Sequence, residues 1–303
     1  MTEQLPLISI VTPSHNQAQF LEESILSVLD QGYPKLEYMV IDGGSTDGSV
    51  DIIRKYEDSL ACWVSEPDRG QAHALNKGFA GATGDLLGWL NSDDVYLPGA
   101  LLTVGQAYCE HPDGCIAGPV INFDVRSGEE RVIPQLTITF ETMVKFWEQQ
   151  CSWHQPGFFF PAKAYEAVGG LDESLVCAMD NDLLCRLLQH CPVAYVDQSL
   201  ARFRLHDSSK TSTILDRCFM ETSQVSQRYW HLLETVDRNQ HDRFMVDQLV
   251  SLAAGRLRQH PARGAELFLQ AVRISPRWLP HAVLGLGRRW VTRKGFPQPP
   301  GES

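Results

Sequence analysis

The sequence lacks the features that mark several classes of protein. No run of about 18 apolar residues occurs, and a helix needs such a run to span a bilayer. No signal-peptide pattern precedes Pro6. The eight cysteines form no Cys-x-x-Cys pair and no zinc-binding spacing. We therefore expect a cytoplasmic protein with reduced thiols.

Positive charge is also scarce. Lys and Arg number 26 against 37 Asp and Glu, which gives a net charge of −11. A chain this acidic is not expected to bind nucleic acid. Hydrophobic residues make up 43% and charged residues 21%, proportions typical of a soluble globular protein. A chain of 303 residues can form one large domain, or one domain with an appendage.

The first 110 residues alternate between short apolar runs and amphipathic stretches, which predict strands and helices respectively. Repeated units of this kind predict a parallel sheet with right-handed crossovers. Polar loops follow the strands, so they should share the edge of the sheet where ligands bind. The predicted strands are 7–12, 36–41, 62–64 and 86–90, and the predicted helices are 18–29, 49–56 and 71–80. Ser49 is expected to cap the second of these helices.

The pattern changes in the remainder of the chain. Shorter strands and irregular segments run from Gly114 to about Leu205, and helices are indicated from Ile214 to about Lys294. No internal repeat is present. The sequence therefore predicts an α/β fold, with a sheet flanked by helices and a C-terminal helical extension.

Two adjacent carboxylates end the apolar run of residues 86–90, in the segment Asn91-Ser92-Asp93-Asp94. Neighbouring carboxylates repel unless a cation, a hydrogen-bond donor or water compensates. In isolation such a pair is more often a solvated turn or a helix cap. Its place at the carboxyl end of a predicted parallel strand favours a ligand site.

Two other loops carry the same kind of ambiguity. The segment 42–48, Asp-Gly-Gly-Ser-Thr-Asp-Gly, is either a turn with an Asp cap or a loop that lets a diphosphate approach the backbone. It is neither a Walker loop nor a G-x-G-x-x-G fingerprint, so ATPase and NAD-binding functions lose support. Asp68-Arg69 precedes a helix carrying Asn76 and Lys77. The charged residues here form either a surface salt bridge or a diphosphate contact through Arg69 or Lys77.

Two candidate residues lie further along the chain. Asp180 begins the predicted helix that contains Leu183 and Leu184, where it is either a cap or a general base. His206 follows an alternating Arg-Phe-Arg-Leu segment. A lone histidine is more often structural, but an imidazole can also complete an oxygen-rich metal site.

Taken together, these segments resemble family 2 glycosyltransferases, the inverting enzymes of GT-A fold. The resemblance covers about the first 210 residues in family order. Asn91-Ser92-Asp93-Asp94 falls on the family's Asp-x-Asp motif, Met179-Asp180 on its acidic base motif, and His206 on its metal histidine. It also includes Ile8–Asn16, Val40–Asp47, Ser65–Gln71 and Ala74–Gly78.

The resemblance implies a role for each candidate residue. Asp94 and His206 would bind Mn²⁺ or Mg²⁺, Asp93 would contact the ribose or the metal shell, and Asp180 would be the base. Residues implied to bind the nucleotide sugar are Thr12, Pro13, Asn16, Asp42, Asp68, Arg69, Asn76 and Asp93. Two departures stand out: Asn91 replaces the first carboxylate of the commonest motif, and Gly43 replaces an Asp that reads uracil in many members.

The implied function is transfer of a sugar from a nucleotide-diphosphate sugar to a saccharide or lipid-linked acceptor, in cell-surface polysaccharide or glycolipid synthesis. A metal-dependent nucleotidyltransferase and a non-catalytic sugar-nucleotide-binding module are the alternatives. We expect a GT-A catalytic domain over 1–210, with a nucleotide-binding half at 1–110 and an acceptor half at 111–210. A helical extension over 211–296 and a disordered tail over 297–303 would follow.

The C-terminal segment concentrates positive charge. From 271 to 303 it holds six basic residues against one acidic residue, Glu302, a net of +5 (6 − 1) within an acidic chain. Apolar residues alternate with these charges, as in an amphipathic helix lying on a membrane surface. The alternative is a helix packed on the protein with a solvated basic face. We expect either this packing or peripheral contact with the inner face of the membrane.

Overall fold

A computed structural model describes residues 5–134, 137–150, 152–207, 209–257 and 260–292, without the side chains of 211, 212 and 287–292. The chain divides into two compact units. The first contains the residues up to 144 and 150–206, and the second contains 145–149 and the residues from 207 onward.

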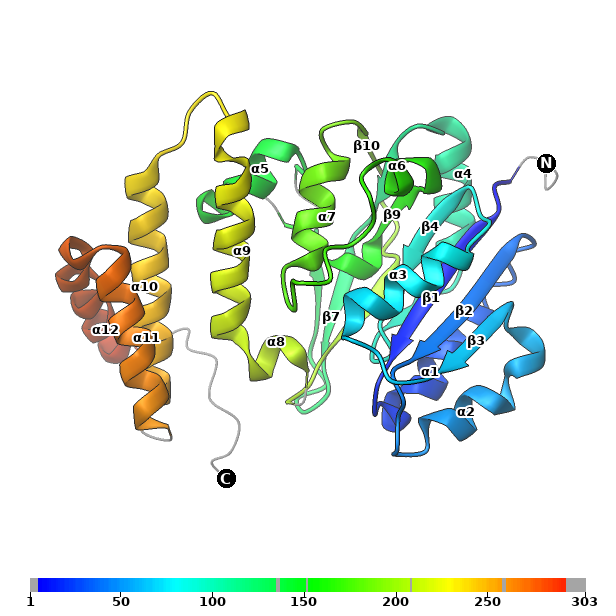
Figure 1. Cartoon of the computed structure of the whole chain (residues 1–303), viewed down its shortest axis with the longest axis horizontal. Helices are drawn as coiled ribbons and strands as arrows, with labels where there is room; N and C mark the ends of the chain where they lie inside the picture. Colours follow the sequence, from blue (N-terminus) through cyan, green and yellow to red (C-terminus); the bar gives the residue numbers. More distant parts are fainter. Residues whose placement is uncertain (1–4, 135–136, 151, 208, 258–259, 293–303) are drawn as a thin grey trace. The chain divides into compact units, whose positions relative to one another are not determined.

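The first unit is built on a seven-stranded sheet in the order β10-β6-β9-β4-β1-β2-β3 (Figure 1). β4 lies parallel to β1, β1 to β2, and β2 to β3, while β9 is antiparallel to both β4 and β6. The strands are β1 (Ile8–Ser14), β2 (Leu36–Asp42), β3 (Cys62–Ser65), β4 (Leu86–Trp89), β6 (Cys115–Ala117), β9 (Phe158–Pro161) and β10 (Val193–Tyr195).

Helices cover both faces of this sheet because the apolar residues of its central strands alternate in direction. Ile8 and Ile10 of β1 belong to the cluster that buries α1, α2 and α4. Val11 of β1 contacts α3 on the other face, where a Cβ at Gly78 would lie 2.5 Å from the Val11 side chain. The helices are α1 (Ala18–Leu29), α2 (Ser49–Lys55), α3 (Gln71–Gly81), α4 (Ala100–Glu110), α5 (Phe140–Val144), α6 (Ala162–Ala167) and α7 (Met179–Leu187).

A second, four-stranded sheet in the order β5-β11-β7-β8 brings distant parts of the chain together. β11 pairs antiparallel with β5, so that Arg202 is opposite Val95. This pairing places the chain that follows Asp94 beside the chain that leads to His206. The strands are β5 (Val95–Tyr96), β7 (Val120–Asp124), β8 (Glu130–Ile133) and β11 (Ala201–Leu205).

The second unit is helical in its described part. It contains α8 (Lys210–Thr213), α9 (Leu215–Tyr229), α10 (Arg238–Arg256), α11 (Pro261–Ile274) and α12 (Leu279–Thr292). Val246, Leu249 and Val250 of α10 are buried with Leu267 and Ala271 of α11. Every helix within the described ranges falls short of the length and apolar character that a bilayer span requires. The predicted disordered tail, 297–303, lies outside the described residues.

The predicted fold class is confirmed, since a mixed α/β sheet flanked by helices precedes a helical extension. The strands and helices predicted for the first 110 residues all form, with ends shifted by no more than two residues. The expected Ser49 cap of α2 is wrong. Gly48 is the N-cap residue of that helix, and Asp47 Oδ1 accepts hydrogen bonds from both the backbone N and the Oγ of Ser49.

Candidate active site

The carboxyl ends of β1, β2 and β3 lie side by side at one edge of the sheet. Ser14, Asp42 and Ser65 occupy neighbouring register positions on the three strands. β4 is parallel to β1, so Asn91 and the carboxylates that follow it lie at the same edge. The sheet thus brings the predicted polar loops together at the edge where open α/β sheets bind ligands.

Asp42 is fully buried at the end of β2. Its Oδ2 accepts hydrogen bonds from the backbone N of Gly44 at 3.0 Å, the backbone N of Ser45 at 2.9 Å and Ser65 Oγ at 2.7 Å. Its Oδ1 accepts a bond from Ser45 Oγ at 2.5 Å. Four donors therefore engage a carboxylate that has about four acceptor positions. Asp42 holds the glycine-rich loop in shape.

Gly43 is a position where the chain approaches another loop closely. A Cβ at Gly43 would lie 2.6 Å from Asp68 Oδ2 and 3.3 Å from His15 Nδ1. The carboxylate of Asp68 and the ring of His15 therefore fill the space that a side chain at position 43 would need. The other oxygen of Asp68 accepts a hydrogen bond from the backbone N of Gly70 at 2.7 Å, at the start of α3.

The residues implied to surround the nucleoside on β1 differ in accessibility. Thr12 is fully buried, and its hydroxyl lies 3.0 Å from that of Tyr38. Pro13 is buried beside it. Asn16 is exposed, has a φ of 52°, and accepts a hydrogen bond from the backbone N of Thr46 through Oδ1 at 2.9 Å. Of these three residues, Asn16 alone presents polar atoms at the surface.

Asp93 and His206 meet at the carboxyl end of β4. His206 Nε2 lies 3.0 Å from Asp93 Oδ2, although 113 residues separate them in sequence. The imidazole ring also packs on Phe20 of α1, with ring centroids 4.7 Å apart. The pairing of β11 with β5 is what brings the two residues together.

Asp94 has a different environment from its neighbour. Its carboxylate is buried, and Oδ1 accepts a hydrogen bond from the backbone N of Arg204 at 2.9 Å. Burial, with the nearby charge of Asp93, raises the pKa of Asp94 well above its usual value. One oxygen of Asp94 is thus bound by β11, the other accepts a hydrogen bond from Asn91 Nδ2 at 3.4 Å, and the role of Asp94 as a metal ligand stays a prediction.

The Asp93–His206 pair is a suitable partial donor set for a divalent metal ion. It offers one carboxylate oxygen, a ligand type that suits Mn²⁺ and Mg²⁺, and one imidazole nitrogen, which can complete an oxygen-rich metal site. Within the described ranges, no three His, Cys, Asp or Glu side chains gather as a complete metal centre. Metal ions that bind phosphates commonly take only one or two protein carboxylates and complete their shell with substrate oxygens and water. The residues present fit that type of site.

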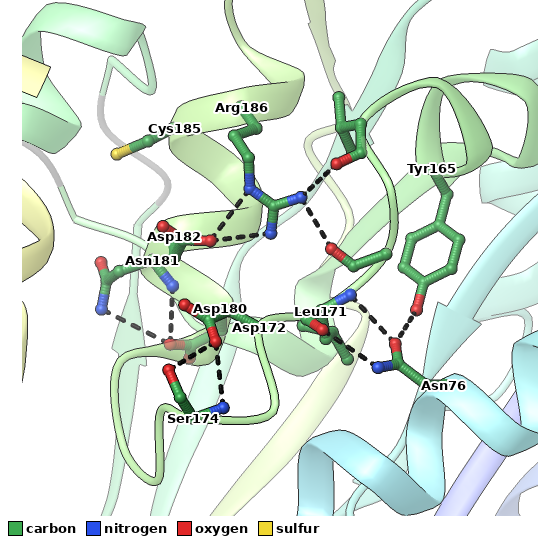
Figure 2. Close-up of polar contacts among 12 residues, drawn as sticks. Asn76, Tyr165, Leu171, Asp172, Ser174, Asp180, Asn181, Asp182, Cys185 and Arg186 are labelled. Atoms are coloured by element: carbon green, nitrogen blue, oxygen red, sulfur yellow. Dashed lines mark hydrogen bonds and ion pairs between the residues drawn. The ribbon is translucent and has the colours of Figure 1, made fainter. Parts of the chain in front are cut away.

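Asp180 lies in the first turn of α7, in the first unit (Figure 2). It is partly buried, and its Oδ1 accepts a hydrogen bond from the backbone N of Asn181 at 2.7 Å. The buried Asp182 two residues later forms an ion pair with Arg186 at 2.7 Å. The helix thus presents one partly accessible carboxylate and one buried, paired carboxylate.

Arg69 and Asn76 contact the segment that leads to α7. Arg69 Nη2 lies 2.5 Å from Glu173 Oε2. Asn76 forms hydrogen bonds with the backbone of Leu171 and with Glu173. The nearby Lys77 pairs with Glu66 at 2.5 Å. The nucleotide contacts implied for Arg69 and Asn76 stay predictions.

Two residues at the site escaped the sequence analysis. Arg204 donates from Nε to the backbone O of Asp93 at 2.8 Å and pairs with Glu23 of α1 at 2.6 Å. Gln155 donates from Nε2 to the backbone O of Trp89, at the end of β4, at 2.7 Å. The alternating charges before His206 were the available signal for Arg204, and the polar segment 153–157 was the signal for Gln155.

Comparisons with known proteins agree with this architecture. A sequence model described as Glycosyl transferase family 2 matches residues 9–168. An uncharacterized glycosyltransferase of Rickettsia typhi is 25% identical over 228 residues, which cover 70% of this chain and 68% of that protein. The putative teichuronic acid biosynthesis glycosyltransferase TuaG of Bacillus subtilis is 39% identical over 99 residues, or 32% of this chain and 39% of that protein.

Solved structures show the same fold. S. aureus TarS 1–349 in complex with UDP-GlcNAc matches with a TM-score of 0.62 and 16% identity, over 87% of this chain and 79% of that one. The mannosyltransferase PcManGT from Pyrobaculum calidifontis, in complex with GDP-Man and Mn²⁺, matches with a TM-score of 0.54 and 19% identity, over 97% and 77%. The GT-A-type fold is thereby confirmed. Because the family model spans more than half of the 303 residues, this chain belongs to glycosyl transferase family 2.

Proposed function

We propose that this glycosyltransferase moves a hexosyl group from a nucleotide-diphosphate sugar to an acceptor hydroxyl with inversion at the anomeric carbon. The observation that carries the proposal is the meeting of Asp93 with His206 at the carboxyl edge of the sheet. Family membership and the partly accessible Asp180 on the acceptor side support it. TarS, whose solved complex holds UDP-GlcNAc, has the same fold.

In this mechanism Asp180 accepts the proton of the acceptor hydroxyl. The freed oxygen attacks the anomeric carbon from the side opposite the diphosphate, and the bond from that carbon to the diphosphate oxygen breaks. A single displacement through an oxocarbenium-like state inverts the configuration. The protein's main contribution is to position the two substrates and to exclude water.

Asp93 and His206 would hold a divalent ion, Mn²⁺ or Mg²⁺, whose charge stabilises the leaving diphosphate when it is bound. This assignment gives Asp93 the ligand role that the resemblance implied for Asp94. It rests on the 3.0 Å separation from His206 and on the buried, backbone-bound position of Asp94. The Mn²⁺ in the PcManGT complex supports a metal in this fold.

Release of a nucleoside diphosphate from a panel of sugar nucleotides tests the proposal. We expect release that requires Mn²⁺ or Mg²⁺ and that increases when an acceptor is present. The anomeric configuration of the product, read by NMR, should be inverted relative to the donor. Release of pyrophosphate from a nucleoside triphosphate would instead identify a nucleotidyltransferase. Donor binding with neither transfer nor hydrolysis would identify a binding module.

The acceptor is proposed to be a saccharide or a lipid-linked saccharide of a cell-surface polymer. The similarity to a putative teichuronic acid glycosyltransferase supports the polymer class. The basic charge of residues 271–303 would favour peripheral contact with anionic lipid, where each basic residue contributes about 1 kcal/mol. Co-sedimentation with anionic vesicles should then fall with salt and with deletion after Ser275. Equal sedimentation of the shortened protein would refute this contact.

A further inference from the structure

The segment between α6 and α7 connects the sheet to the helix that carries Asp180. It begins with Gly169 and Gly170, whose φ angles of +79° and +76° side chains rarely adopt. Arg186 of α7 donates from Nη1 to the backbone O of Val168 at 2.6 Å and of Gly170 at 2.7 Å (Figure 2). Asp182 holds the same guanidinium by an ion pair. Helix α7 therefore binds, through Arg186, the start of the segment that leads to it.

Asn76 of α3 forms hydrogen bonds with Leu171, the next residue of the segment. Its Nδ2 donates to the backbone O of Leu171 at 3.0 Å, and the backbone N of Leu171 donates to its Oδ1 at 2.9 Å (Figure 2). This double contact reproduces the way in which a neighbouring strand pairs with a peptide group. Tyr165 donates its hydroxyl to the same Oδ1 at 2.6 Å, and Nδ2 also donates to Glu173 Oε1 at 3.1 Å.

A carboxamide offers two acceptor positions and two donor hydrogens. All four positions of the Asn76 carboxamide are occupied by Tyr165, Leu171 and Glu173. No position remains for a donor nucleotide while these bonds are intact. Asn76 therefore acts on the chain itself.

The helix that carries Asn76, α3, is packed tightly against the sheet. α3 lies so close to β1 and β2 that a Cβ at Gly78 would come within 2.5 Å of Val11 and 3.2 Å of Ile41. Leu171 and Leu175 of the segment 169–178 are buried, which limits the movement of this segment further. The position of Leu171 relative to the sheet is thus set from α3.

We propose that Asn76 is a positioning residue, which fixes the segment 169–178 on α3 and thereby sets the place of Asp180 for proton transfer. This inference rests on the proposed role of Asp180 as the base. Misplacing a reacting group by about 1 Å can cost about 100-fold in rate. Glu173, which Arg69 and Asn76 both contact, extends the same attachment to the loop before α3.

The test compares Asn76→Ala with the wild-type enzyme. We expect kcat for transfer to fall by about 10- to 100-fold, while the donor KM and the Kd for the nucleoside diphosphate stay within about twofold. Amide hydrogen exchange over residues 171–178 should accelerate in the free variant. The matched control is Gln189→Ala, which removes an exposed carboxamide just after the end of α7. This variant should change neither kcat nor amide exchange over residues 171–178.

A paired variant separates positioning from a general defect of α3. Asn76→Asp should lower kcat because its carboxylate faces Glu173 and no longer donates to Leu171. Adding Glu173→Gln returns a donor to that contact and should recover part of kcat, a rescue that a misfolded α3 would not show.

A fall in donor affinity as large as the fall in kcat would overturn the proposal and make Asn76 a donor ligand. Unchanged kcat and unchanged exchange would also overturn it. If the wild-type enzyme released no nucleoside diphosphate from any donor, the proposed function would fail. In that case the exchange measurement would still decide whether Asn76 holds the segment.

Discussion

Asp42 ends one buried parallel strand and Asp93 follows another in the same sheet, yet different parts of the chain contact their carboxylates. The donors that surround Asp42 come from residues 44, 45 and 65, all within the first 110 residues. The partner of Asp93 is His206, which the second sheet delivers from 113 residues away. The carboxylate of Asp42 is bound by its own loop and by the neighbouring strand, whereas that of Asp93 is paired with a residue far along the chain.

The same contrast extends to the two halves of the first unit. In residues 1–110, the carboxylates of Asp42 and Asp47 accept backbone hydrogen bonds that shape loops. In residues 111–206, α7 carries Asp180, and β11 leads to His206, which lies 3.0 Å from Asp93. Hydrogen bonds between residues close in the sequence therefore shape the loops of residues 1–110. Contacts between residues far apart in the sequence assemble the groups proposed to do chemistry. Substitutions in the two halves should fail in different ways.

The largest effect is expected for Asp180→Asn. Because the amide cannot accept the acceptor's proton, turnover should fall by about 10²–10⁴, while donor affinity stays unchanged. Transfer rates and donor titration calorimetry measure the two quantities. Loss of donor affinity instead would make Asp180 a cap or a donor ligand, and residues 111–206 would then resemble residues 1–110.

Asp42→Ala should fail through the fold. The substitution leaves two backbone N–H groups and two hydroxyls without their charged acceptor, and hydrogen bonds to charged groups contribute about 1.5–3 kcal/mol each. We expect the free energy of unfolding to fall by about 4 kcal/mol or more in urea titrations. Asp42→Asn, which keeps the acceptor oxygen, is the milder control. Full stability with lost donor binding would show that Asp42 contacts the nucleotide after all.

Acid should also destabilise the first unit through a histidine of residues 111–206. His154 stacks on Phe203 of β11, and burial lowers its pKa from 6.5 to about 4. As pH falls below 6.5, the unfolded chain binds the proton before the folded chain does. This residue's contribution to stability is therefore complete above pH 6.5 and is lost toward pH 4, by about 2–3 kcal/mol.

Urea titrations at pH 7 and pH 4.5 measure that loss. His154→Phe keeps an aromatic ring on Phe203 and removes the titrating group, so it should lose less stability over this range than the wild-type protein. An identical loss in both proteins would place the acid sensitivity elsewhere.

The sequence predicted the regular elements well because their signals are local. Helix α1 was predicted with the ends that it has, since its apolar face repeats every three to four residues. The glycine-rich and acidic loops were placed at one edge because parallel strands share a direction. Hydrogen bonds between residues far apart in the sequence leave no comparable local pattern.

The state of each candidate side chain was therefore not predictable. The saturation of Asp42 depends on Ser65 of the next strand, and the filled carboxamide of Asn76 depends on a segment almost a hundred residues away. The place of Asp94 depends on a backbone bond to Arg204 of β11. Residue type and order indicated the chemistry, and the pairing of the second sheet determined which carboxylate lies beside His206.

The difference between Asp93, which lies beside His206, and Asp94, which is bound by β11, gives the last prediction. Asp93→Ala removes the carboxylate beside His206, so the Mn²⁺ concentration needed for half-maximal activity should rise by about 10- to 100-fold or more, the range seen when a supporting residue of a metal site is lost. Its side chain is only partly buried, so the melting temperature should change little. Asp94→Asn keeps an oxygen that can accept the bond from the backbone N of Arg204, and it should leave the Mn²⁺ titration close to that of the wild-type enzyme. If Asp94→Asn shifts the titration and Asp93→Ala does not, the metal role belongs to Asp94, and the carboxylate now directed at β11 must turn toward the donor when substrate binds.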